Sequence, residues 1–133
     1  MLRTLLASLA LLCFTLVAGL EAQAPTPPIK RTILQKTDVP GSTTHEVVLV
    51  LAEVSGGANV GRHTHPGPEI GTVVEGELVL LVEGQPEKTI KAGESFQVAG
   101  GVVHDAKAAG GKPAKIIVVY TAKKGEPLAS PAK

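Results

Sequence analysis

Three histidines and one glutamate carry the chemistry that this sequence indicates most clearly. His63 and His65 are separated by one residue, so in an extended segment both imidazoles point to the same face. Glu69 follows the turn signal Pro66-Gly67-Pro68, which lets the chain fold back and bring the carboxylate towards the same point. His104, far along the chain between strand-like segments, can supply another nitrogen. These four side chains outline a metal site.

The donor types also indicate which kind of metal site this is. Imidazole nitrogens together with a carboxylate suit borderline divalent metals, and three histidines with one glutamate leave positions free in an octahedral shell. Free positions let a substrate or dioxygen bind, whereas a closed site of four cysteines would only hold structure. An H-x-H pair alone is a weak signal, because surface strands carry such pairs by chance. The residues spaced around the pair therefore decide how strongly it indicates a metal site.

The bulk composition limits the other functions that the chain can have. Its 133 residues suit one domain, because domains commonly have about 100 to 150 residues. With 13 basic and 12 acidic residues the net charge is +1, and no basic stripe is visible. Two Phe, one Tyr and no Trp offer no stacking platform for single strands. We therefore expect a small-molecule ligand or substrate and no nucleic-acid partner.

Residues 1–24 are interpreted as a secretory signal peptide. Arg3 supplies the positive start, residues 5–20 carry no charge, and Ala22-Gln23-Ala24 has the small-x-small form of a cleavage site. We expect cleavage after Ala22 or Ala24, a periplasmic or secreted protein, and no stable membrane insertion afterwards. The alternative is an uncleaved membrane anchor, because the uncharged run is only slightly shorter than the roughly 17 to 25 residues that span a bilayer. Cleavage would also remove Cys13, the only cysteine.

The rest of the chain alternates short β-rich segments with turn residues and shows no sustained helical period. Residues 25–37 are interpreted as a linker and first edge strand, 38–122 as a β-barrel domain, and 123–133 as a polar tail. Many short strands with Gly and Pro between them indicate an all-β sandwich or closed barrel. Strands are expected at 30–35, 45–54, 69–75, 77–83, 88–91, 95–98 and 114–122, and Gly100-Gly101 breaks the run before Val102-Val103-His104.

The residues around the histidine pair resemble the first signature of the cupin superfamily at every fixed position. Gly57 is followed after five residues by His63, after one more by His65, after three by Glu69, and after six by Gly76. Together with a second match around His104, the resemblance covers about residues 47–119. This first signature is specific.

A second segment is similar to the second cupin signature, with two departures. Gly93, Gly101 and His104 are in register with it. Ala99 stands where the family usually has Pro, and Ala108 stands where it often has Asn. Neither departure removes a metal ligand, so what they change is the outer surroundings of the metal.

The resemblance implies a small, single-domain protein of the cupin type-2 kind. Its fold would be all-β, a single double-sheet jelly-roll barrel. Inside the barrel His63, His65, Glu69 and His104 would hold one divalent metal ion, which in cupins is usually Mn, Fe, Ni, Cu or Zn. The resemblance also implies a homodimer formed through sheet edges.

We therefore expect an exported mononuclear-metal cupin that acts on a small metal-chelating molecule. A quercetinase-like dioxygenase is the leading reaction, in which Glu69 either ligates the metal or acts as general base. Two alternatives stay open. One is a non-catalytic periplasmic cupin that binds a ligand or a metal, and the other is a metal-dependent isomerase or epimerase. Whether the protein is an enzyme is therefore an open question at this point.

Three further observations bear on the cavity walls. Tyr120 lies in an apolar strand and is interpreted as a packing residue rather than a hydrogen-bond donor in the cavity. His45 is interpreted as an exposed residue at the start of a strand. In the segment 95–98, aliphatic or aromatic residues alternate with polar ones, and either pair can face inward.

Overall fold

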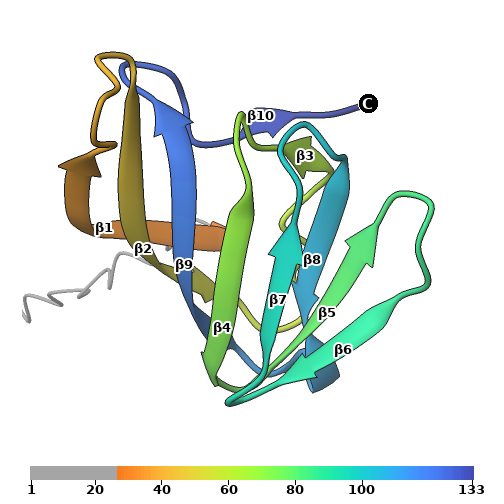
Figure 1. The fold of residues 1–133 in the computed structure, drawn as a ribbon. Helices are drawn as coiled ribbons and strands as arrows, with labels where there is room; N and C mark the ends of the chain where they lie inside the picture. Colours follow the sequence, from red (N-terminus) through yellow and green to blue (C-terminus); the bar gives the residue numbers. More distant parts are fainter. Residues whose placement is uncertain (1–26) are drawn as a thin grey trace, which may run out of the picture.

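A computed structural model describes residues 27–133, and their secondary structure is almost entirely β. Within these residues, two five-stranded antiparallel sheets pack against each other (Figure 1). One sheet has the order β1-β2-β9-β4-β7, and the other has the order β10-β3-β8-β5-β6. This architecture confirms the predicted all-β, double-sheet jelly-roll barrel. The elements are β1 (Ile29–Asp38), β2 (His45–Val54), β3 (His63–Thr64), β4 (Glu69–Glu75), β5 (Glu77–Val82), β6 (Lys88–Lys91), β7 (Ser95–Val98), β8 (His104–Ala108), the 3-10 turn η1 (Ala109–Gly111), β9 (Ala114–Lys123) and β10 (Ser130–Pro131).

Two long strands with alternating burial set the register of the first sheet. Every second side chain of β2 is buried from Val48 to Val54, and the side chains between them are half-buried. The strand β9 alternates in the same way, and its buried Val118 lies opposite the buried Val50 of β2. Because side chains alternate along a strand, a slip of one residue would turn every apolar side chain outward. The alternating Val, Ile and Leu residues thus specify both the strand and its pairing.

The inward side chains of the two sheets form one apolar core. Val50 and Val73 from the first sheet and Ile90 from the second are 0% exposed. Burying an aliphatic side chain of this size stabilises the fold by about 1.5 to 3 kcal/mol. The core stops at the one group of buried polar side chains within residues 27–133, which consists of His63, His65, Glu69 and His104.

Most strand predictions agree with the structure to within one or two residues. The strand that carries His104, β8, begins at this residue and runs to Ala108, so Val102 is not part of it. Val102 instead takes part in a turn, in which its N–H donates to the Ala99 carbonyl at 3.3 Å. The structure also settles the facing of β7, where Phe96 and Val98 are buried and the two polar residues are exposed.

Both ends of the described chain are part of the sheets. The first strand, β1, runs to Asp38 and pairs with β2 along its whole length, with a register shift between Ile33 and Gln35. In the tail, Ser130 and Pro131 pair with β3 (Figure 1). The barrel therefore extends beyond the range 38–122 on both sides. The predicted signal peptide, 1–24, lies outside the described residues. No helix in the described part of the chain is long and apolar enough to cross a membrane.

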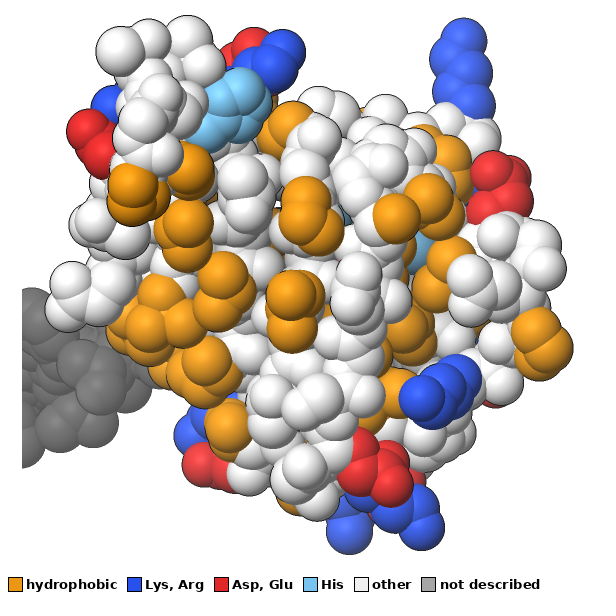
Figure 2. All heavy atoms as spheres, viewed as in Figure 1, with side chains coloured by type: hydrophobic (Ala, Val, Ile, Leu, Met, Phe, Trp, Pro, Cys, Tyr) orange, Lys and Arg blue, Asp and Glu red, His pale blue; other side chains and the backbone are white. Residues whose placement is uncertain are grey.

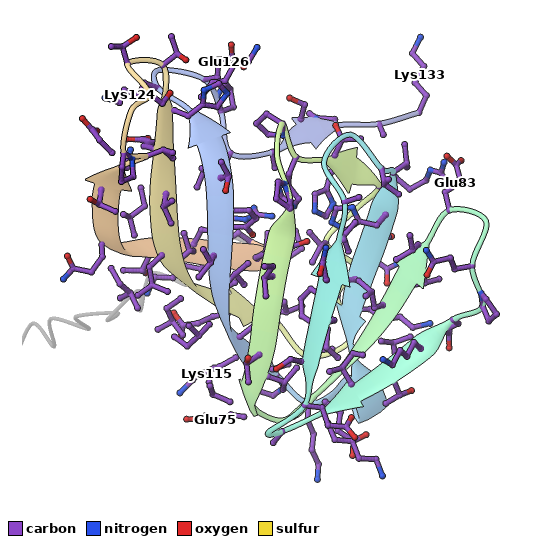
Figure 3. All side chains as sticks on the ribbon, in the orientation of Figure 1. Glu75, Glu83, Lys115, Lys124, Glu126 and Lys133 are labelled. Atoms are coloured by element: carbon purple, nitrogen blue, oxygen red, sulfur yellow. The ribbon has the colours of Figure 1, made fainter. Side chains whose placement is uncertain are left out.

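Charged side chains lie on the outside of the barrel, where several form ion pairs. Figure 3 shows Glu75 and Lys115 together at the end of the barrel away from the tail, and their charged atoms are 2.9 Å apart. Glu83 pairs in the same way with Arg62 at 2.9 Å. Exposed pairs of this kind contribute little to stability because solvent screens the charges, so they do not determine the fold.

Two glycines shape the stretch that carries the histidines. Gly76 has a φ of +75°, and a Cβ there would lie 2.5 Å from the Pro113 carbonyl oxygen. A Cβ on Gly67 would lie 2.2 Å from the carbonyl oxygen of Thr121 in β9. Gly67 is therefore required because the turn before β4 passes directly against the backbone of β9. This close approach brings Glu69 to the mouth of the site.

Candidate metal centre

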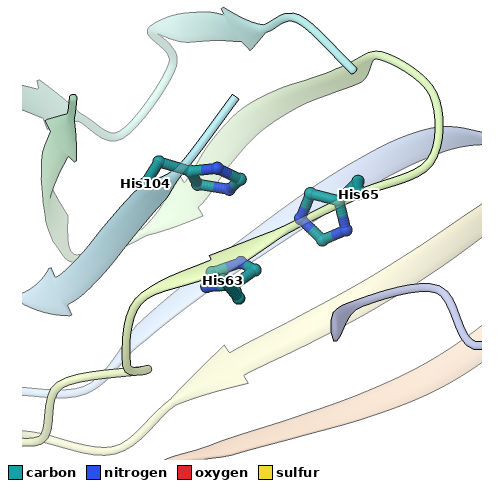
Figure 4. A group of neighbouring side chains, drawn as sticks. All are labelled: His63, His65 and His104. Carbon is teal, nitrogen blue, oxygen red and sulfur yellow. The ribbon is translucent and has the colours of Figure 1, made fainter. Parts of the chain in front are cut away.

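The three site histidines come from two neighbouring strands of one sheet. His63 opens β3, and His104 opens β8 directly opposite it in the antiparallel register. His65 follows β3 and, two positions after His63, returns to the same face. Figure 4 shows the three imidazoles pointing towards one another. Glu69 begins β4 in the other sheet, so the group forms where the two sheets meet.

The imidazoles are buried and close together. Their exposed fractions are 9% for His63, 3% for His65 and 3% for His104. The ring centroids of His63 and His104 are 4.3 Å apart, and one ligand nitrogen from each of the three histidines lies within 4.8 Å of the others. Three histidines in this arrangement can hold one metal ion between them.

Backbone carbonyls fix which nitrogen of each ring faces the centre. Nδ1 of His63 donates to the Gly61 carbonyl at 2.6 Å, and Nδ1 of His65 donates to the Leu128 carbonyl at 2.6 Å. Nδ1 of His104 donates to the Val102 carbonyl at 3.0 Å. A carbonyl oxygen can only accept, so each Nδ1 carries the hydrogen and each neutral ring keeps a lone pair on Nε2. This outer support is the usual one for histidines that bind metal.

The Nε2 atoms meet the carboxylate of Glu69. Oε2 of Glu69 is 3.0 Å from Nε2 of His104 and 3.4 Å from Nε2 of His65. Neither of these nitrogens forms a hydrogen bond, although both are buried. Buried polar atoms without a partner are rare in proteins and call for an explanation. A divalent ion at the centre would satisfy them, so the donor set fits a metal.

The pKa shifts describe the same coupled group. Burial alone raises the pKa of Glu69, but its interactions with His104 and His65 outweigh burial and hold the pKa well below its usual range. Burial lowers the pKa of His104, and the nearby Glu69 carboxylate more than reverses this, so that the pKa is raised. For His63 burial dominates, and its pKa is lowered. Glu69 is therefore a carboxylate, and His63 is a neutral ligand, near neutral pH.

Tyr120 belongs to the site, which corrects its interpretation as a packing residue alone. It lies opposite Glu69 in the pairing of β4 with β9, and its hydroxyl donates to Oε1 of Glu69 at 3.1 Å. Burial raises the pKa of Tyr120, as does the negative charge of Glu69, so the phenol keeps its proton. Tyr120 thus leaves Oε2 of the same carboxylate facing the histidines. Its position in an apolar strand hid this role.

An internal cavity adjoins the four predicted ligands, and its wall includes a residue that sequence reasoning missed. The cavity has a volume of about 30 Å³ and is lined by His63, Glu69, His104 and Tyr120 together with apolar side chains. Arg31 also lines it, from β1. The alternation along β1 could have revealed Arg31. Ile29 and Arg31 are two positions apart, so their side chains share a face, and they lie opposite the buried Val54 and Ala52 of β2.

The two departures from the cupin pattern lie outside this ligand group. Ala108, at the end of β8, is 4% exposed and packs in the apolar core. Ala99 is exposed in the turn before β8 and accepts the N–H of Val102 there. The structure brings together His63, His65, Glu69 and His104 as the sequence predicts. It places His45 away from them, half-buried and in contact with the Thr44 hydroxyl at 2.9 Å.

Comparison with known proteins identifies a cupin domain in the region that carries the four predicted ligands. The cupin domain family model matches residues 50–120. The HTH-type transcriptional regulator PuuR of Escherichia coli (strain K12) is 32% identical over 82 residues, which are 61% of this chain and 44% of that protein. The PuuR protein of Shigella flexneri gives the same values. The chain thus spans less than half the length of these curated relatives.

Solved structures show the same fold at low sequence identity. A double-stranded β-helix protein from Klebsiella pneumoniae has a TM-score of 0.64 at 21% identity, with 84% of both chains covered. The DMSP lyase DddQ from Ruegeria pomeroyi has a TM-score of 0.63 at 19% sequence identity, and the match covers 79% of this chain and 52% of that one. Oxalate oxidase in complex with glycolate has a TM-score of 0.61 at 23% identity, and the match covers 80% of this chain and 56% of that one. At these identities the likeness establishes the fold alone.

Proposed function

Because this chain belongs to the cupin family, we propose that it binds one divalent metal ion and acts there on a small metal-chelating molecule. Nε2 of His63, His65 and His104 and the carboxylate of Glu69 would hold the ion. One observation carries this proposal: three Nδ1 atoms donate to backbone carbonyls, so three Nε2 lone pairs face one point. A bound divalent ion would act there as a Lewis acid towards the oxygens of a chelating ligand.

The residues around the ion would divide the remaining tasks. Tyr120 holds Oε1 of Glu69, which fixes the carboxylate plane and keeps Oε2 towards the histidines. Oε2 would either ligate the ion or take a proton from the ligand. The apolar walls from both sheets, including Phe96 and Ile116, exclude water from the ligand. Exclusion of water strengthens every electrostatic interaction inside such a site.

The cavity also limits the size of the ligand. Its volume of about 30 Å³ is room for only a few waters or a ligand of a few atoms. A reaction with dioxygen of the quercetinase type would therefore take a compact chelator, such as an enediol or a 1,2-diketone, more readily than a polycyclic flavonol. This dioxygenase is the first candidate activity.

A non-catalytic ligand-binding cupin is the second candidate. It is favoured by the similarity to PuuR, whose name describes a transcriptional regulator and of which this chain matches 44%. It also agrees with the polar groups of the cavity, where only Glu69 and Tyr120 stand beside the histidines as proton carriers within the described residues. In this case the same site would bind a chelating ligand without turnover.

Oxygen uptake by metal-loaded protein separates the two candidates. The protein would be loaded with each of Mn, Fe, Ni, Cu and Zn and tested against catechols, flavonols and compact diketones. Uptake that requires both metal and substrate supports the dioxygenase. Tight ligand binding without uptake rejects it and supports the binding protein. A metal-loaded His104→Ala sample is the control for uptake by free metal.

We also propose export to the periplasm or the outside of the cell.

We further propose assembly as a homodimer, which is supported by apolar side chains that gather on the outer face of the first sheet (Figure 2). On β4, Ile70 is 50% exposed and Val74 is 46% exposed. Ile70→Glu should convert the dimer to a monomer in light scattering, whereas Glu77→Lys, on β5 of the other sheet, should not.

A further inference from the structure

We propose that Arg31 is an anion-binding residue of the metal cavity, and that the ligand there is a small carboxylate. Its carboxylate group would contact the Arg31 guanidinium while its other oxygens reach the side of the cavity that holds the histidines. This inference rests on the proposed metal site and names the class of ligand that the site takes.

The position of Arg31 is fixed by the pairing of β1 with β2. Arg31 lies opposite Ala52, which is 3% exposed, so its side chain leaves the strand on the inward face. There it lines the cavity together with His63, Glu69 and Tyr120. Its positive charge is felt by two of them, because it lowers the pKa of His63 and opposes the rise in the pKa of Tyr120. Arg31 therefore belongs to the electrostatics of the site.

Arg31 has no charged partner within residues 27–133, although its guanidinium hydrogen-bonds with the Tyr120 hydroxyl. Its Nε is buried and has no hydrogen-bond partner. None of the ion pairs formed by the described residues includes it. Arg62, which also lies near His63, differs in both respects, because it pairs with Glu83 at 2.9 Å and its Nε donates to the Lys133 carbonyl at 3.3 Å. A buried guanidinium nitrogen without an acceptor is costly, and a bound anion would supply the acceptor that Nε of Arg31 lacks.

The charge balance of the loaded cavity favours the same class of ligand. Arg31 and a divalent ion carry three positive charges, and Glu69 supplies one negative charge, so two positive charges remain without compensation. A carboxylate is the anion whose two oxygens match the planar guanidinium, and it also leaves the rest of the molecule free to chelate. The cavity of about 30 Å³ favours a compact member of this class.

Arg31 also borders a hollow at the surface. This second hollow is lined by Arg62 and by Ser130 and Pro131 of β10. The two hollows share Arg31 and His63 in their linings. Arg31 therefore lies both in the wall of the metal cavity and beside a surface hollow, which suits a residue that contacts a ligand from solvent.

Binding of lactate, a three-carbon 2-hydroxy acid, tests this inference directly. Its neutral isostere lactamide is the matched ligand, and Lys36→Met is the matched variant for the loss of one positive charge, because Lys36 lies on the same strand and pairs with Glu46. Titration calorimetry on manganese-loaded protein should show lactate binding that Arg31→Met weakens by about ten- to a hundredfold, because a charge-assisted bidentate contact is lost. Lys36→Met should bind lactate like the wild type, and lactamide should bind weakly to all three proteins.

The metal content of each protein keeps this test separate from the proposed function. Elemental analysis should give the same manganese content in wild type and Arg31→Met. If the wild type holds no metal, the proposed function fails, and the same titration on metal-free protein decides the role of Arg31. Arg31→Lys, which keeps the charge and the packing of the stem, covers the case in which Arg31→Met does not fold, and should recover only part of the affinity.

Three results would overturn the inference. The first is equal lactate affinity in wild type and Arg31→Met, or in wild type and Arg31→Lys if only that variant folds. The second is lactamide binding as tight as lactate binding, or no carboxylate binding by the wild type. The third is sulfate binding as tight as lactate binding, which would show a general anion site rather than a carboxylate site.

Discussion

The stretch from Gly57 to Gly76 and the two ends of the described chain build the same site in different ways. The stretch supplies side chains that face the centre, namely His63, His65 and Glu69. The two ends supply groups that surround these ligand side chains. From one end β1 brings the half-buried Arg31 into the cavity wall, and from the other the Leu128 carbonyl accepts the hydrogen of His65 Nδ1. Three of the four predicted ligands thus come from local spacing, whereas His104 and the groups that set orientation and charge come from distant segments.

Loss of a ligand should have the largest effect. His63→Ala or His104→Ala should abolish stoichiometric metal while the circular dichroism spectrum stays β-rich, because the core lies elsewhere in the barrel. His45→Ala is the matched control, since the ring of this fourth histidine hydrogen-bonds with the Ser42 and Thr44 hydroxyls, away from the site. Full metal content in both site variants, measured by elemental analysis, would contradict the ligand assignment.

Removal of the tail should have the next largest effect. Deletion of residues 128–133 removes the Leu128 carbonyl, which orients the His65 ring, and also removes the strand β10. Loss of such an outer-shell partner should weaken metal binding by about ten- to a hundredfold, measured by competition with a chelator. Deletion of residues 132–133 alone keeps that carbonyl and β10 and serves as the control. Equal affinity in both truncated proteins and the wild type would show that the tail does not orient His65.

Glu69→Gln should change how the metal-free protein responds to pH. The fold lowers the pKa of Glu69 from 4.5 and raises the pKa of His104 from 6.5. The contribution of Glu69 is present above pH 4.5 and is lost as the pH falls through its lowered value. The contribution of His104 is present below pH 6.5 and is lost as the pH rises through its raised value.

The pair should therefore stabilise the metal-free fold most between these two pH values. Glu69→Gln should lower the free energy of unfolding there by about 2 kcal/mol, measured in urea. Glu83→Gln, which alters only an exposed ion pair, is the control. An unchanged pH profile in Glu69→Gln would contradict the coupling of Glu69 with His104.

Tyr120→Phe should have the smallest effect of the four. It removes the hydroxyl that donates to Oε1 of Glu69 but keeps the buried ring. We expect full metal content and a free energy of metal binding reduced by about 1 kcal/mol, because one hydrogen bond is lost without a cavity. A loss of metal as large as that in His104→Ala would instead make Tyr120 essential for assembling the site.

The ligands and most strands could be predicted from sequence because their signals are local. His63 and His65 need only an extended segment to share a face, and β2 and β9 show their inward face through alternation. The family signature adds the glycines. The structure explains one of them, Gly76, because a Cβ there would lie 2.5 Å from the Pro113 carbonyl oxygen.

The surroundings of the site could not be predicted because they depend on pairing between distant segments. Tyr120 reaches Glu69 only through the register of β4 with β9, so an apolar strand concealed a donor. The Leu128 contact uses a backbone carbonyl, which no side-chain pattern reveals. Two-residue strands such as β10 are too short to show alternation.

The metal content of the wild-type protein tests the central claim most directly. The full chain, purified without chelators, would be exposed to Mn, Fe, Ni, Cu and Zn in turn and measured by elemental analysis after gel filtration. We expect one divalent ion per chain with at least one of these metals. Substoichiometric metal with all five would contradict it, and would leave the unpartnered Nε2 atoms of His65 and His104 to be explained by Glu69 alone.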